Sequence, residues 1–172
     1  MSKLTLLPYN LPGQIYRSPL PFSSMFDRLE EVWPAYKTAG IQTVVMLLSE
    51  QEASQHSGRD IRQLYEQAGL QVISSPVEDF SAPPHGSFDA AIQQVIRLAQ
   101  QGQAIAIHCH AGIGRTGMFA ACLARELWGW NSDDAIAWVR QFIPQAVESD
   151  FQVRFVEEYQ PSGKHNPAEN KT

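Results

Sequence analysis

The stretch HCHAGIGRTG, residues 108–117, decides how the rest of this chain is arranged. It follows a short apolar run at 104–107, which is typical of a buried strand, and it precedes a run from Met118 to Trp128 whose small and apolar residues predict a buried helix. A glycine-bearing loop between a strand and a helix presents unpaired backbone N–H groups and the positive end of a helix dipole. The sequence therefore predicts an anion site here, with phosphate as the expected ligand.

Two side chains in this stretch have the chemistry to act on a bound phosphate. Cys109 and Arg115 are separated by five residues, among them Gly112 and Gly114, which let the backbone curl between them. A thiol that faces N–H donors and a guanidinium ionises more readily than a free cysteine, so Cys109 is the expected nucleophile. The planar fork of Arg115 can hold two phosphoryl oxygens and stabilise the charge of the transition state, and Thr116 can offer its hydroxyl to the sulfur.

The same ten residues resemble the signature loop of the cysteine-dependent protein tyrosine phosphatase superfamily, in its small dual-specificity branch. The resemblance extends over most of residues 13–160, and the run 39–70 is similar to the kinase-associated members of that branch. It implies that Cys109 forms a phosphocysteine, that Arg115 binds the phosphoryl oxygens and that Thr116 helps the thiolate depart. It also implies that His108 orders the loop without reacting. The phosphate is then expected against His110, Ala111, Gly112, Ile113, Gly114 and Arg115.

The segment PVEDFSAPP, residues 76–84, supplies a candidate for the proton donor that a departing oxygen requires. It directly follows a predicted strand, so it should lie at the edge of the sheet where α/β proteins place their sites. The resemblance implies a general-acid aspartate on a mobile loop, which also acts as the base in phosphocysteine hydrolysis, and Asp79 lies 30 residues before Cys109. Glu78 is the nearest competitor, and an ordinary solvated acidic turn is the alternative without function.

The composition limits the number of domains and the class of partner. The 172 residues are 44% hydrophobic, enough for one domain with a substantial core and too few for two ordinary ones. We therefore expect one catalytic domain over 1–160 and a disordered tail over 161–172, which is almost free of apolar residues. A net charge of −5 with only 13 lysines and arginines argues against nucleic acid or an anionic membrane as partner.

The small number of cysteines and the absence of long apolar runs indicate in which compartment the protein resides. Cys109 and Cys122 are too few for a disulfide framework, and Cys122 is expected to be a packed apolar residue. No window approaches a membrane span, and the apolar stretch at the N-terminus is too short for a signal core. A soluble, cytoplasmic monomer is the expectation.

The order of apolar patterns predicts an α/β fold, in which a central, mostly parallel sheet of four to five strands is flanked by helices. The resemblance implies the three-layer architecture of tyrosine phosphatases. Strands are expected at 41–48, 70–73 and 104–107, with a short edge strand at Ile15–Arg17, and a polar excursion is expected at 49–58. Helices are expected at 22–39, 61–68, from a cap at Ser87 to 101, at 118–128, from 131 or 132 to 142, and from 146 onward with Phe151, Phe155, Val156 and Tyr159 facing inward.

The glycines and histidines of the 108–117 stretch also fit other sites. Its Gly-x-Gly-x-x-Gly pattern occurs in dinucleotide-binding folds, but those need a second strand with an acidic tip about 20 residues on, where residues 131–142 predict a helix. His108 and His110 flank the cysteine, but adjacent strand residues point to opposite faces and no companion cluster completes a tetrahedral set. Neither a metal nor a cofactor is expected.

Two further alternatives concern the Cys-x5-Arg spacing itself. A rhodanese-like domain can carry such a loop, although Asp79 and the helices after the loop favour the tyrosine phosphatase fold. A phosphate-binding module without catalysis is the non-enzyme alternative. Binding-only relatives generally lose one of Cys109, Arg115 and Asp79, and all three are present here, so an enzyme is the better hypothesis.

The predicted substrate is a phosphorylated protein or peptide. Phosphotyrosine ranks first and phosphoserine and phosphothreonine stay open, because a chain this short lacks the elements that deepen the pocket of large tyrosine-specific members. Phosphoinositide and inositol phosphate phosphatases of the family typically carry lysines in the loop, where this chain has His110 and Ile113, so they are the alternative. In larger members a glutamine positions the hydrolytic water. Gln152 is a candidate, but a solvated helix position is the more ordinary interpretation.

Overall fold

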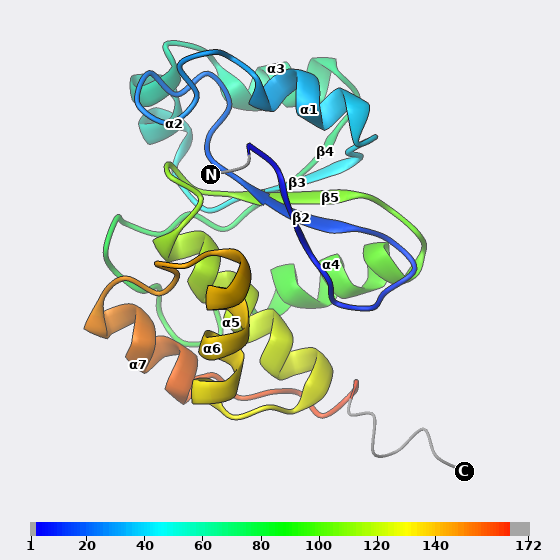
Figure 1. The fold of residues 1–172 in the computed structure, drawn as a ribbon, viewed down its shortest axis with the longest axis vertical. Coiled ribbons are helices and arrows are strands. Elements are labelled where there is room, and N and C mark those ends of the chain that lie inside the picture. Colours follow the sequence, from blue (N-terminus) through cyan, green and yellow to red (C-terminus); the bar gives the residue numbers. More distant parts are fainter. Residues whose placement is uncertain (1–2, 166–172) are drawn as a thin grey trace.

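A five-stranded sheet forms the middle layer of the computed structural model, which describes residues 3–165 (Figure 1). Its strands are β1 (Thr5–Leu7), β2 (Ile15–Ser18), β3 (Thr43–Met46), β4 (Gln71–Ser74) and β5 (Ile105–His108), in the spatial order β1-β2-β5-β3-β4. Four strands are parallel to one another, and β1 pairs antiparallel with β2. The predicted mostly parallel sheet is confirmed.

Helices cover both faces of the sheet, as Figure 1 shows. One face carries α1 (Val32–Thr38), α2 (Glu50–Ser57) and α3 (Ile61–Gln67), and the other carries α4 (Asp89–Gln100), α5 (Gly114–Trp128), α6 (Ser132–Phe142) and α7 (Asp150–Glu158). Val44 and Met46 of β3 belong to the hydrophobic core under α1 and α3, whereas Val45 joins the core under α4 and α5. This alternation follows from the two-residue period of a strand, and the predicted three-layer α/β architecture is confirmed.

The 108–117 loop lies at the carboxyl edge of the sheet, directly after the central strand β5. Since β2 and β3 flank β5 and run parallel to it, the segments that follow them reach the same edge. Backbone hydrogen bonds join these segments to the loop: the Leu20 N–H donates to the His110 carbonyl, and the Leu47 N–H donates to the His108 carbonyl, each over 2.9 Å. Two neighbouring chain segments therefore hold the loop in place.

Near the N-terminus the structure differs from the prediction. The expected edge strand at Ile15–Arg17 is an inner strand, because β1 pairs with it on its outer side. The expected helix over 22–39 is reduced to α1. The cause is the buried Asp27, whose carboxylate accepts hydrogen bonds from three backbone N–H groups and so folds the preceding residues into an irregular loop; the donors are Phe22, Glu31 and Val32.

The predicted polar excursion at 49–58 is also wrong, because these residues form α2. The helix buries only Ala53, so it has no apolar periodicity. Its caps specify it instead: the Ser49 side chain accepts a hydrogen bond from the Glu52 N–H, and Gly58 ends the helix with φ 68°. Further on, α4 begins after Phe88 without a side-chain cap, rather than at Ser87.

The last helix begins later than predicted, at Asp150, with Ser149 as its N-cap. Phe155, Val156 and Tyr159 are buried as expected, whereas Phe151 is 66% exposed. Gln152 is fully buried, so its interpretation as a solvated helix position is wrong.

Part of the expected disordered tail is ordered. The Ser162 N–H donates to Glu126 Oε2 over 2.9 Å, and His165 Nε2 lies 3.0 Å from Gln93 Oε1, so residues 161–165 lie against α5 and α4. The rest of that tail, 166–172, lies outside the described residues. Within residues 3–165, no helix is long and apolar enough to cross a membrane.

Candidate active site

A cavity of about 460 Å³ opens beside the 108–117 loop and brings together residues that are distant in sequence. Cys109 lines it, together with Asp79 from the segment after β4. Of the residues predicted to hold phosphate, four also line it, namely His110, Ala111, Ile113 and Gly114. Gly112, Arg115 and Thr116 belong to the same loop and the first turn of α5, but they are not among the lining residues.

The loop backbone passes close to a neighbouring segment and leads directly into the N-terminus of α5. Gly112 has φ 73°, and a Cβ there would lie 2.1 Å from the Ser18 carbonyl oxygen, so only glycine fits this close approach. Ile113, at the N-cap of α5, provides no side-chain cap, whereas the Gly117 N–H is already bonded to the Ile113 carbonyl. The N-terminus of α5 therefore faces the loop, the arrangement that binds phosphate in other α/β proteins, and the N–H of its first residue, Gly114, is hydrogen-bonded to the Glu148 carboxylate.

Arg115 is buried, with 1% of its surface exposed, and its orientation is fixed by a carboxylate. Its Nη1 and Nη2 donate to the two Glu52 oxygens over 2.9 and 2.7 Å, and Nη1 also donates to the Val77 carbonyl over 2.9 Å. Burial alone would lower the pKa of Arg115, but the hydrogen bonds to Glu52 and the nearby Cys109 and Asp79 together raise it. The guanidinium is therefore permanently charged and held in one position.

Two buried polar atoms next to the loop have no hydrogen-bond partner among the described residues, namely Arg115 Nε and Thr116 Oγ1. An unpaired buried donor costs free energy, about 1–3 kcal/mol. Such atoms are expected where a ligand or a reaction intermediate completes the hydrogen bonding. Glu52 holds both Nη groups of Arg115, whereas Nε has no partner among the described residues.

Asp79 lies at the mouth of the cavity, and its side chain is 52% exposed. Its Oδ1 lies 3.3 Å from Arg115 Nη2 and accepts a hydrogen bond from the Phe80 N–H. Glu78, the competing candidate, is not among the residues that line the cavity. The geometry thus favours Asp79 over Glu78 as the carboxyl group close to a bound phosphate.

The two histidines that flank Cys109 are each held by contacts with neighbouring protein groups. His108 is fully buried: Nδ1 lies 3.0 Å from the Cys109 carbonyl and Nε2 lies 2.9 Å from the Tyr65 hydroxyl. Burial, aided by the charge of Arg115, lowers the pKa of His108 to about 4. His110 stacks on His56 with ring centroids 3.6 Å apart, and burial together with His56 lowers its pKa. Both rings are therefore neutral at pH 7.

Two carboxylates of the site have no counterpart in the predicted set. Glu52 comes from α2, and only the Ser-x-x-Glu capping pattern that begins at Ser49 could have indicated the helix that carries it. Glu148 precedes α7 and lines the cavity together with Asp79 and Cys109. No local pattern in the sequence singles out Glu148, because the fold alone brings it to the loop.

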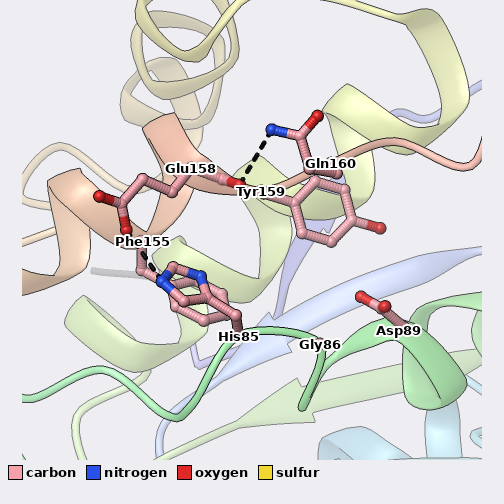
Figure 2. A pocket seen from close by; sticks show the side chains of 7 residues that line it. All are labelled: His85, Gly86, Asp89, Phe155, Glu158, Tyr159 and Gln160. Carbon is pink, nitrogen blue, oxygen red and sulfur yellow. Dashed lines mark hydrogen bonds and ion pairs between the residues drawn. The ribbon is translucent and has the colours of Figure 1, made fainter.

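A second cavity, of about 500 Å³, lies between the start of α4 and the end of α7 (Figure 2). Its lining includes Asp89, Tyr159 and Gln160 but neither a thiol nor an arginine. Figure 2 shows His85 paired with Glu158, and the two side chains are 3.0 Å apart. None of the predicted catalytic residues lines this cavity, so we place the active site in the cavity of about 460 Å³ beside the 108–117 loop. We interpret the contact between His85 and Glu158 as a structural one that joins the segment after Asp79 to α7.

Comparisons with known proteins agree with this geometry. Residues 23–127 match the family model described as "Polymorphic toxin system, DSP-PTPase phosphatase". The chain is 30% identical over 87 residues to cyclin-dependent kinase inhibitor 3 of Rattus norvegicus, a match that covers 51% of this chain and 41% of the rat protein. The match thus spans about two fifths of that relative.

Solved structures show the same fold. Kinase associated phosphatase (KAP), with its catalytic-site cysteine substituted by serine, aligns with a TM-score of 0.80 and 21% identity, covering 90% of this chain and 92% of that one. PTPMT1 in complex with PI(5)P aligns with a TM-score of 0.68 and 17% identity, covering 84% and 88%. The matched family model covers more than half of the chain, so the predicted family is confirmed: this chain belongs to the DSP-PTPase family of cysteine-dependent phosphatases.

Proposed function

We propose that this member of the family removes phosphate from proteins, with phosphotyrosine as its main substrate and phosphoserine and phosphothreonine as further ones, through a phosphocysteine intermediate. The observation that carries the proposal is the convergence of Cys109, Asp79 and the charged Arg115 on one side of the sheet. Cys109 and Arg115 come from the 108–117 stretch and Asp79 from the segment after β4, and together they provide a nucleophile, an oxyanion binder and a proton donor.

In the first step, Cys109 Sγ attacks phosphorus while the bond from phosphorus to the substrate oxygen breaks. The Asp79 carboxylic acid gives a proton to the leaving oxygen. Arg115 and the backbone N–H groups of residues 110–115 hold the phosphoryl oxygens. In the second step, water attacks phosphorus and passes a proton to the Asp79 carboxylate while the bond from phosphorus to Cys109 Sγ breaks. Inorganic phosphate leaves, and the Thr116 hydroxyl stabilises the returning thiolate.

The rim of the cavity supports an aryl phosphate on a peptide. Met25, Phe26 and Phe80 line it and are 60%, 36% and 59% exposed. A tyrosine ring and its apolar neighbours could bury this surface. The described lining contains no lysine or arginine, and it includes two carboxyl groups, Asp79 and Glu148. A substrate with several phosphates would find no cationic partner for its other charges there, so inositol phosphates and phosphoinositides are the weaker candidates.

A substrate panel tests this proposal. Phosphotyrosyl, phosphoseryl and phosphothreonyl peptides of one sequence, together with phosphoinositides and inositol phosphates, are assayed for phosphate release with the wild type and with Cys109→Ser. We expect the highest kcat/KM for the phosphotyrosyl peptide, no requirement for metal, inhibition by vanadate, and no activity in the variant. A higher kcat/KM for an inositol lipid would overturn the substrate assignment, and activity in Cys109→Ser would overturn the mechanism.

A further inference from the structure

A third cavity adjoins the active-site cavity, and the mechanism above gives it no role. It has a volume of about 320 Å³, and four residues line both cavities, namely Met25, Phe26, Ala111 and Ile113. The residues that line only this adjoining cavity are Lys3, Arg17 and Pro19. Among the described residues, its lining therefore carries two cations and no carboxyl group, whereas the active-site lining carries Asp79 and Glu148 and neither lysine nor arginine.

Arg17 supplies a buried positive charge to the adjoining cavity. It lies on the inner strand β2, opposite Ile107 of the strand that leads to the nucleophile, and only 1% of its surface is exposed. Burial lowers the pKa of Arg17, and interaction with Cys109 and Tyr36 acts against this effect. Because a guanidinium stays protonated in proteins, this charge persists at neutral pH and reaches Cys109 as well as the adjoining cavity.

Lys3 places a second cation at the same cavity. Its side chain is 31% exposed, and its Nζ lies 3.7 Å from both Asp27 Oδ1 and Glu31 Oε2, distances longer than hydrogen bonds. Nζ also donates to the Phe26 carbonyl over 3.4 Å, which uses one of its three N–H donors. The ammonium group is therefore held beside Phe26, at the boundary of the two cavities, and keeps donors for an anion.

The boundary between the cavities has polar side chains inside and apolar ones outside. Ser23 and Asp27 are buried, whereas Met25 and Phe26 are exposed. The Ser23 hydroxyl accepts hydrogen bonds from the Met25 and Phe26 N–H groups over 3.4 and 3.2 Å. It also lies 3.1 Å from His110 Nε2, and the Phe26 ring meets the His110 ring edge-on with centroids 4.8 Å apart. Met25 and Phe26 are thus held against the 108–117 loop, which reduces the ordering that binding costs.

This arrangement fits an extended peptide that carries a second anionic side chain. A phosphotyrosine in the active-site cavity lies on one side of Met25 and Phe26, and Lys3 lies on the other. A second anion must be joined to the phosphate by a chain that crosses this boundary, as an extended peptide does at about 3.3 Å per residue. The compact ring of an inositol phosphate offers no such chain. Because Asp79 and Glu148 repel an anion from the active-site cavity, the second anion is favoured on one side of the phosphotyrosine only.

We propose, on the basis of the protein phosphatase function above, that the adjoining cavity is a second anion subsite for the peptide substrate. Lys3 donates to the carboxylate or phosphate of a residue within about three positions of the phosphotyrosine, and Arg17 adds its charge from inside the protein. The subsite binds this residue without taking part in the chemistry at Cys109, so it lowers KM rather than raising kcat.

Peptides that share one sequence and one phosphotyrosine test the subsite. Glutamate replaces glutamine in turn at each of the three positions before and after the phosphotyrosine, and the fluorescence of the released tyrosine reports dephosphorylation. On one side only, we expect glutamate to raise kcat/KM about 2- to 5-fold through a lower KM, the range of a partly exposed ion pair. Phosphoserine at the same position should have a larger effect, because it carries about −1.5 to −2 charges. Both effects should shrink as the salt concentration rises.

Variants of Lys3 connect this preference to the adjoining cavity. Lys3→Gln should lose most of the preference for glutamate over glutamine, and Lys3→Glu should favour lysine at the same peptide position. Lys37→Gln is the matched control and should keep the wild-type ratio, because Lys37 is exposed on α1 and lines neither cavity. Each ratio compares two peptides with one protein, so a partly unfolded variant does not change it.

The inference is overturned if the wild type prefers glutamate at none of the positions, or if Lys3→Gln keeps the full preference. It is also overturned if Lys3→Gln weakens the hydrolysis of an inositol bisphosphate and of no peptide, since the second anion would then belong to a ring. Failure of the proposed function is distinguishable from these results, because no phosphotyrosyl peptide, the glutamine peptide included, would then be hydrolysed.

Discussion

Acidification should destabilise this protein through His108, the buried histidine directly before the nucleophile. Its two ring nitrogens are both used in the neutral form: Nδ1–H donates to the Cys109 carbonyl, and Nε2 accepts from the Tyr65 hydroxyl. Burial raises the pKa of Tyr65, so the hydroxyl stays a donor. Protonation would place a second N–H against this donor and a positive charge near Arg115. The folded state therefore resists protonation of His108.

The size of the effect follows from the pKa. Folding lowers the pKa of His108 from 6.5 to about 4. Between these values the unfolded chain binds more protons than the folded one, so stability falls as the pH falls. At about 1.36 kcal/mol per pH unit, the full loss is about 3 kcal/mol below pH 4, and about 2 kcal/mol of it occurs between pH 7 and pH 5. Above pH 6.5, where His108 is neutral in both the folded and the unfolded chain, this loss of stability is absent.

Urea unfolding at pH 5, 6 and 7 measures this loss when the wild type is compared with His108→Gln, whose amide keeps one donor and one acceptor. The wild type should lose about 2 kcal/mol more than the variant between pH 7 and pH 5. Equal pH dependence in the two proteins would refute the reasoning. If the variant does not fold, NMR titration of the wild type gives the answer, because a His108 ring that titrates near pH 6.5 in the folded protein would also refute it.

Four substitutions test the rest of the site. Asp79→Asn should lower turnover of a phosphotyrosyl peptide about 10²- to 10⁴-fold at neutral pH, whereas Glu78→Gln should stay near the wild type; the reverse result would move the general acid by one residue. Glu52→Gln should weaken phosphate or vanadate binding about 10-fold or more, because the fork of Arg115 loses a charge-assisted contact, and an unchanged Kd in calorimetry would contradict this. Gly112→Ala should destabilise the fold by more than about 1 kcal/mol, since φ is 73° and the methyl group meets backbone; unchanged urea stability would show that the loop is not constrained there.

Sequence patterns predicted the central part of this protein well, for a local reason. The strand β5, the 108–117 loop and α5 are consecutive in the chain, so an apolar run, two glycines and a Cys-x5-Arg spacing are visible together. The parallel sheet followed from alternating strands and helices. The position of Asp79 beside the loop also followed, because a segment after a parallel strand reaches the carboxyl edge.

The two missed carboxylates show where local patterns end. Glu52 lies on a helix that buries a single alanine, so hydrophobic periodicity could not reveal α2 or its contact with Arg115. Glu148 reaches the cavity through a turn with a valine at positive φ, held by Arg140 from α6. Sequence propensities disfavour that conformation, and only packing against α5 and α6 selects it.

The most direct test of the phosphocysteine mechanism is to trap the intermediate during turnover. The wild type is mixed with a peptide that carries radiolabelled phosphotyrosine, quenched in acid within milliseconds, digested and mapped. We predict label on the peptide that contains Cys109, and none in Cys109→Ser, although that variant still binds the phosphopeptide. Turnover by the wild type without label on Cys109, or turnover that persists in Cys109→Ser, would contradict the mechanism.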